Sequence, residues 1–127
     1  VIDDEVAANE LTKTVLKGVV PSQVKLGIFT IQKAADRILK GFKPADKVII
    51  LVKTPITILR LVEMGVEFKA LNIGGMGITA SRKTFYQNIA CSDEEREAIR
   101  KLVGLGCDVT IQIVADDQKV EVAKLLK

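Results

Sequence analysis

The chain has 127 residues, of which 48% are hydrophobic, and its 19 basic residues exceed its 16 acidic residues by a net charge of +3. This length supports one domain with a sizeable core, and neither an apolar run of about 20 residues nor a signal-peptide pattern indicates a membrane span or secretion. The basic residues are scattered and only 4% of the residues are aromatic, which argues against nucleic-acid binding.

The N-terminal residues are expected to complete one strand and begin one helix. Val1-Ile2 has the composition of a strand end, which implies that an earlier strand–helix unit is missing before it. Asp3 or Asp4 can cap the helix that follows, and Gly18 ends it. Apolar or small residues recur with helical spacing at Ala7, Leu11, Thr14, Val15 and Gly18.

Two further strands are expected in the first half of the chain. Residues 24–29 form the first, and Thr30 then caps a helix that ends at Gly41. The inward face of this helix is Ile31, Ala34, Ala35 and Ile38. Residues 48–52 are uninterrupted aliphatic residues. A run without polar alternation is typical of a central parallel strand that is covered on both faces.

A helix and the most informative strand come next. Thr54 and Pro55 suit the N-cap and first position of a helix that ends at Gly65. Its inward residues are Ile58, Leu59 and Val62. A strand over residues 68–73 then runs into Gly74-Gly75. Because glycine lacks a Cβ atom, the backbone can turn sharply there and come close to a ligand.

The last third is expected to contain two strands and two helices. Residues 84–90 resemble a strand, and Ser92 with Glu95 forms a capping box for a helix. The inward face of that helix is Ile99, Leu102 and Val103. Residues 109–114 begin with a period-two alternation, which favours a half-exposed edge strand. Asp116-Asp117 leads a final helix through Val120, Ala123 and Leu126.

The alternation of strands and helices predicts one α/β domain over residues 1–127. We expect a doubly wound, mainly parallel sheet with helices on both faces and an edge strand near 109–114. In such sheets ligands bind where the carboxyl ends of several strands meet. The segments that follow the strands are therefore the first places to look for a functional site.

Lys53, Thr54 and Pro55 form the best candidate for an anion site. A helix start presents backbone amides and a partial positive charge, to which Thr54 adds a hydroxyl and Lys53 a full charge. Taken alone, the simpler interpretation is that Thr54 only caps the helix and Lys53 is solvated. The acidic run Asp3 to Glu5 could bind a metal, but helix capping explains it better, and we expect no metal and no cofactor.

Other site classes fit the sequence poorly. Residues 75–80 match the dinucleotide fingerprint G-x-G-x-x-A, but no helical pattern follows them, as that motif requires. The chain has no histidine, so neither Ser81 nor Cys91 has the usual base of a nucleophile. Cys91 and Cys107 do not form a C-x-x-C pair and are expected to be reduced and buried.

Taken together, the motifs resemble one protein family. They are Asp3-Asp4-Glu5-Val6-Ala7, Lys13-Thr14-Val15-Leu16-Lys17, Lys53-Thr54-Pro55, residues 59–66 and Leu71-Asn72-Ile73-Gly74-Gly75-Met76. In this order they resemble the IIB component of the mannose/fructose/sorbose family of the bacterial phosphoenolpyruvate-dependent sugar phosphotransferase system. Asn-Ile-Gly-Gly-Met is the most specific element, and the resemblance covers essentially the whole chain.

The resemblance implies a cytoplasmic phosphocarrier, located at the inner face of the membrane through its partners. In the family, a histidine takes a phosphoryl group from the IIA component and passes it to a sugar held by the membrane components IIC and IID. Lys53, Thr54 and Pro55 with Gly74 and Gly75 would then form the phosphate pocket. Its walls would be Asp4, Asn72 and Met76. The family more often has Asn before Pro55, so the side-chain contribution of Thr54 stays open.

The phosphorylated histidine of the family has no counterpart among these residues. The abrupt start at Val1 favours an N-terminally shortened protein, which would be inactive by itself, over a natural relative that is not phosphorylated. The alternative function is therefore a non-catalytic binding or regulatory module of the same family. The sequence does not specify the sugar, and assembly into a homo-oligomer stays open.

Overall fold

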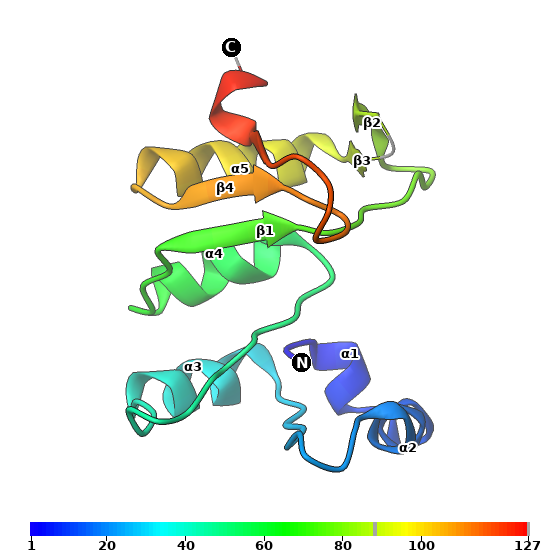
Figure 1. The fold of residues 1–127 in the computed structure, drawn as a ribbon, viewed down its shortest axis with the longest axis vertical. Helices are drawn as coiled ribbons and strands as arrows, with labels where there is room; N and C mark the ends of the chain where they lie inside the picture. The colour runs from blue at the N-terminus through cyan, green and yellow to red at the C-terminus, as the bar shows by residue number, and fades with distance from the viewer. Residues whose placement is uncertain (88, 127) are drawn as a thin grey trace.

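The computed structural model of the chain describes residues 1–87 and 89–126 (Figure 1). Its helices are α1 (Asp4–Ala7), α2 (Glu10–Val19), α3 (Ile31–Leu39), α4 (Pro55–Glu63), α5 (Asp93–Gly104) and the 3₁₀ turn η1 (Val122–Lys124). Its strands are β1 (Ala70–Ile73), β2 (Lys83–Tyr86), β3 (Ile89–Cys91), β4 (Asp108–Ile111) and β5 (Val120–Glu121). The predicted α/β class is confirmed.

The largest sheet has its strands in the order β1-β4-β5. β1 and β4 are parallel, with Leu71 opposite Val109 and Ile73 opposite Ile111, whereas β5 is antiparallel to β4. β4 therefore lies in the middle, and the predicted edge position near 109–114 is wrong. The period-two alternation is present, because Val109 and Ile111 are buried and their neighbours are not. That pattern describes the two faces of a strand and cannot reveal which strands pair with its edges.

The predicted starts of α3, α4 and α5 are confirmed. The side chains of Thr30 and Thr54 each accept a hydrogen bond from a backbone amide in the first turn, and Pro55 follows Thr54 at the first helical position. Ser92 and Glu95 form the reciprocal capping box. Caps satisfy amides that have no partner within the helix, and the residues involved are two or three positions apart. Local sequence therefore suffices to place them.

The core lies where α4 and α5 pack against each other beside β1 and β4 (Figure 1). Leu61 of α4 and Ile99 of α5 have no exposed surface, and Ile58 and Leu102 are nearly as buried. The predicted inward residues Leu59, Val62 and Val103 are half-buried. The apolar stripe of α4 is thus centred on Ile58 and Leu61, three positions apart on one helix face.

The first helix of the prediction is two helices in the structure. Asp3 caps α1 as expected, through a hydrogen bond of 2.9 Å from the Val6 amide. Asn9 then caps α2, because its side-chain oxygen accepts a hydrogen bond from a backbone amide and restarts the helix. The helical spacing does not mark a buried face in α2, where Leu11 is 75% exposed and Val15 57%.

Two predicted strands do not form within the described residues. Of residues 24–29, only Phe29 makes a β-bridge, parallel to Ile2. Residues 48–52 contain no strand, although their backbone accepts a hydrogen bond from the Ile2 amide. The predicted burial on both faces is also wrong, since Ile49 is 83% exposed.

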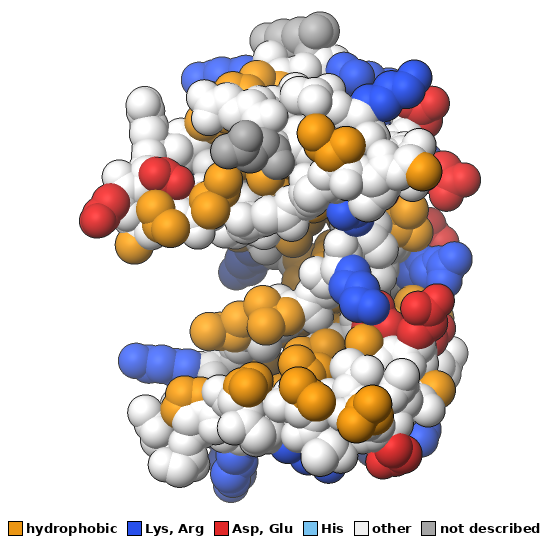
Figure 2. Space-filling model, turned by 90° about the vertical axis from the view of Figure 1, so that its right-hand side faces the viewer, with side chains coloured by type: hydrophobic (Ala, Val, Ile, Leu, Met, Phe, Trp, Pro, Cys, Tyr) orange, Lys and Arg blue, Asp and Glu red, His pale blue; other side chains and the backbone are white. Residues whose placement is uncertain are grey.

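Figure 2 shows a deep cleft with hydrophobic side chains along its lower edge.

The two remaining differences lie in the last third of the chain. The single strand predicted over residues 84–90 is the hairpin of β2 and β3, in which Gln87 adopts a φ of 47°; residue 88 lies outside the described residues. The predicted final helix is replaced by β5 and η1. Pairing of β5 with β4 outweighs the weak helical spacing of the sequence there.

Candidate functional site

A small hollow lies where β1 ends and α4 begins. Nearly all of the predicted site residues line it: Lys53, Thr54, Pro55, Asn72, Gly74, Gly75 and Met76. Its volume is about 60 Å³, far below the roughly 300–1,000 Å³ of pockets for drug-sized molecules. A hollow of this size suits a small ion or the phosphoryl end of a larger molecule.

Gly74 and Gly75 keep this hollow open. A Cβ atom on Gly75 would meet no atom within 4 Å, and one on Gly74 would meet only the Asn72 side chain at 3.9 Å. Neither glycine has a positive φ, so the sharp turn expected from the sequence is not what requires them. Within residues 1–87 and 89–126, neither of their amides donates a hydrogen bond. The two glycines thus provide room and free donors for a ligand.

The start of α4 offers fewer free donors than its position suggests. Pro55 has no amide hydrogen, and the Ile56 amide donates to Thr54 Oγ1 at 3.3 Å. The Thr54 hydroxyl donates its one hydrogen to Glu95 Oε2 at 2.7 Å. Thr54 therefore acts as a cap in this arrangement, and α4 can favour an anion through its dipole rather than through these hydrogen bonds.

Lys53 provides a positive charge beside the hollow. Its Nζ lies 3.6 Å from Asp3 Oδ2, and its side chain is 63% exposed. Exposed ion pairs contribute only about 0–1 kcal/mol, so Lys53 can exchange Asp3 for another anion at little cost. Asp4, predicted as a wall of the pocket, does not line the hollow. Its Oδ1 accepts a hydrogen bond from the Ile31 amide at 2.8 Å, at the start of α3.

Asn72 and Met76 hold the loop after β1 in place. Asn72 Nδ2 donates to the Gln112 carbonyl at 3.0 Å, which connects the ends of β1 and β4. The Met76 side chain is 5% exposed, and its carbonyl accepts a hydrogen bond from the Ala90 amide of β3 at 2.8 Å. Gly74 and Gly75 are therefore fixed on both sides by residues that belong to the sheet or the core.

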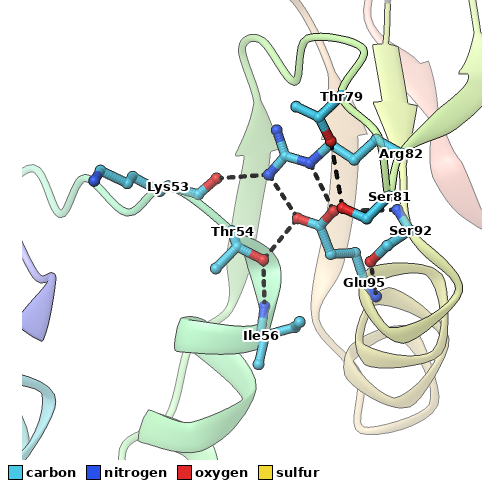
Figure 3. Close-up of polar contacts among 8 residues, drawn as sticks. All are labelled: Lys53, Thr54, Ile56, Thr79, Ser81, Arg82, Ser92 and Glu95. Atoms are coloured by element: carbon cyan, nitrogen blue, oxygen red, sulfur yellow. Dashed lines mark hydrogen bonds and ion pairs between the residues drawn. The ribbon is translucent and has the colours of Figure 1, made fainter. Parts of the chain in front are cut away.

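A buried ion pair next to this hollow was not predicted from the sequence (Figure 3). Arg82 Nε donates to Glu95 Oε1 at 2.7 Å and Arg82 Nη2 to Glu95 Oε2 at 2.8 Å. The side chains are 19% and 5% exposed, respectively. Arg82 Nη2 also donates to the Lys53 carbonyl at 3.3 Å, while the Lys53 side chain extends away from the pair. Glu95 was explained by the capping box alone, although that motif uses only one of its two oxygens.

Both members of this pair are charged at neutral pH. Burial by itself would raise the pKa of Glu95, but hydrogen bonds from Arg82, Thr54 and the Ser92 amide outweigh it and hold the pKa below its usual value. The hydrogen bond to Glu95 raises the pKa of Arg82 further. The carboxylate thus accepts four hydrogen bonds, which satisfies a buried charge.

The other sites considered from the sequence find little support. Residues 74–82 form no helix, so the dinucleotide fingerprint lacks its required context. No cluster of metal-ligating side chains occurs in residues 1–87 and 89–126. Cys91 and Cys107 are buried free thiols, as predicted. A larger hollow of about 260 Å³ lies at the end of β4. The side-chain amide of Gln112, which lines it, already donates hydrogen bonds to the backbone carbonyls of Ala115 and Asp117.

No helix in the described part of the chain is long and apolar enough to cross a lipid bilayer.

Comparison with known proteins gives one consistent result. The family model described as "PTS system sorbose subfamily IIB component" matches residues 1–127. The N-acetylgalactosamine-specific phosphotransferase enzyme IIB component 1 of Escherichia coli is 32% identical over 124 residues, which are 96% of this chain and 78% of that protein. The mannose-specific EIIAB component of E. coli is 30% identical over 127 residues; the chain spans only 39% of its length.

A solved structure agrees with these relatives. The IIBSor domain of the sorbose permease from Klebsiella pneumoniae has a TM-score of 0.88 and 26% sequence identity to this chain. The match covers 98% of this chain and 77% of that domain. The arrangement of β1, β4, α4 and α5 is therefore shared with the IIBSor domain.

Proposed function

Because this chain belongs to the sorbose subfamily of IIB components of the sugar phosphotransferase system, we propose that the hollow between β1 and α4 holds the phosphoryl group during transfer. Membership makes the chain a component of a sugar-phosphorylating transport system. The place of phosphoryl binding, the route of transfer and the partners are our proposal. The resemblance stated from the sequence is confirmed by the family match.

One observation carries this proposal. Residues from two loops far apart in the sequence, Lys53 to Pro55 and Gly74 to Gly75, line the same small hollow. The free amides of the glycines, the dipole of α4 and the exposed charge of Lys53 all favour an anion at this place. Phosphoryl transfer depends mainly on positioning and on stabilising charge, which such an arrangement supplies.

Under this proposal the phosphoryl group passes from the IIA component, through a histidine outside these 127 residues, to a sugar bound by the membrane components IIC and IID. The chain itself contains no histidine. The name of the EIIAB relative joins an A and a B component in one protein, which supports a IIA partner. A cytoplasmic location at the membrane surface would follow from these contacts.

Phosphorylation of the intact gene product tests the proposal. It is incubated with labelled phosphoenolpyruvate, the general phosphocarrier proteins of the system and IIA, and acid-labile phosphate on it is measured. Gly75→Ala keeps the amide hydrogen but adds a methyl group in the open space there, which should displace the phosphoryl group from the amide. Loss of one hydrogen bond to a charged group costs about 1.5–3 kcal/mol, so transfer should slow about ten- to a hundredfold. Gly77→Ala is the control. A Cβ atom added at Gly77 also meets no atom within 4 Å, and Gly77 does not line the hollow.

A second function remains a candidate because the sequence has no histidine. In this alternative the chain is a non-catalytic binding or regulatory module of the same family. The same experiment separates the two functions. An intact gene product that binds IIA but acquires no acid-labile phosphate would contradict the carrier function and support the regulatory one.

A further inference from the structure

The Arg82–Glu95 pair connects the two sides of the hollow without lining it. On one side, Glu95 accepts the hydrogen of the Thr54 hydroxyl, and Arg82 donates to the Lys53 carbonyl. On the other side, Arg82 ends the loop that begins with Gly74 and Gly75. Figure 3 shows these contacts converging from the α4 start, the α5 start and the loop before β2.

These contacts exceed what the start of α5 needs. A capping box requires one oxygen of Glu95, and Oε1 fulfils this role by accepting the Ser92 amide at 3.1 Å. The other oxygen faces Thr54, 41 residues away in the sequence. Burying two charges has a desolvation cost that only good geometry offsets. Capping one helix does not require this cost, because a capping box forms without the arginine. The additional effect of the pair is to fix the Lys53–Thr54 turn.

We infer that Arg82 and Glu95 form a positioning pair, which holds the Lys53–Thr54 turn at the distance from Gly74 and Gly75 that an anion in the hollow requires. This inference rests on the proposed function. Neither residue touches the phosphoryl group. They act through Thr54, whose hydroxyl accepts the Ile56 amide at the start of α4 and donates its hydrogen to Glu95.

The pair also controls charge near the hollow. Glu95 alone would place a negative charge one hydrogen bond away from Thr54, a lining residue, and would repel an anion. The guanidinium of Arg82 cancels this charge and covers both carboxylate oxygens. Loss of Arg82 should therefore weaken anion binding both by releasing the turn and by exposing the anion to Glu95.

Titration of the intact gene product with inorganic phosphate tests this inference, with the amide resonances of Gly74 and Gly75 as the readout. Arg82→Ala should weaken phosphate binding about tenfold, within the range typical of coupling between sites. Arg100→Ala removes the same charge from an exposed pair on α5, and Ile99→Ala destabilises the core beside Glu95. Both controls should bind phosphate as the wild type does, at a temperature where every variant is folded.

The outcomes separate the inference from the function on which it rests. No phosphate-dependent shift at Gly74 or Gly75 in the wild type would overturn the phosphate hollow and the inference with it. Binding in the wild type that persists in Arg82→Ala would overturn the inference alone. If Arg82→Ala does not fold, the same phosphate titration of Arg82→Lys tests the inference. It keeps the charge but lacks the planar fork that reaches Glu95 and the Lys53 carbonyl together, so weakened binding supports positioning and unchanged binding refutes it.

Discussion

Replacing Glu95 with alanine should destabilise the fold far more than the same replacement at Glu97 on the same helix. The Glu95 side chain is 5% exposed and accepts four hydrogen bonds. Its loss leaves the guanidinium of Arg82, whose side chain is 19% exposed, without a counter-charge and with only its hydrogen bond to the Lys53 carbonyl among the described residues. Breaking a buried ion pair in this way costs about 3–5 kcal/mol. The Glu97 side chain is 57% exposed, and its one ion pair among the described residues is with Arg100. An exposed pair of this kind contributes about 0–1 kcal/mol.

The free energy of unfolding, obtained from urea titrations followed by far-UV circular dichroism, measures this difference. A change in the midpoint at a constant slope reports stability alone. Glu97→Ala is a matched control because it removes the same group from the same helix. If Glu95→Ala lies within about 1 kcal/mol of Glu97→Ala, the carboxylate is not a buried structural charge, and the reasoning about Arg82 and Thr54 is refuted.

Two further predictions concern titration and thiol reactivity. Burial raises the pKa of Glu95, but the hydrogen bonds from Arg82 and Thr54 outweigh it, so the net pKa is lowered on folding. The carboxylate therefore stabilises the fold above its unfolded pKa of about 4.3, and this contribution is lost as the pH falls through the folded value. Between pH 6 and pH 3, the urea midpoint should fall more steeply for the wild type than for Glu95→Gln. Parallel curves for the two proteins would contradict this prediction. Burial raises the pKa of the Cys91 and Cys107 thiols. Iodoacetamide should therefore label both thiols slowly in the native chain and rapidly in urea. Equal labelling rates under the two conditions would show that the thiols are accessible in the native chain.

Local signals located the parts of the site but not its assembly. Thr54 and Pro55 were recognisable because a cap and a first-turn proline depend on residues within one turn of helix. Gly74 and Gly75 were recognisable from the end of a strand. The Arg82–Glu95 pair was missed, since its contacts with Lys53 and Thr54 join residues 29 and 41 positions apart. Asp4 was misplaced for a similar reason, because its partner is the Ile31 amide of another helix.

The sequence by itself determined the starts of α3, α4 and α5, the inward stripe of α3 and the strand that leads to Gly74, because each depends on neighbours within a few residues. Only the tertiary structure decided which extended segments become strands. Residues 48–52 have the composition of a central strand, yet they pair through one described hydrogen bond with Ile2 and leave Ile49 in solvent. A strand exists through its partners, and the backbone hydrogen bonds that create it come from segments that composition does not identify.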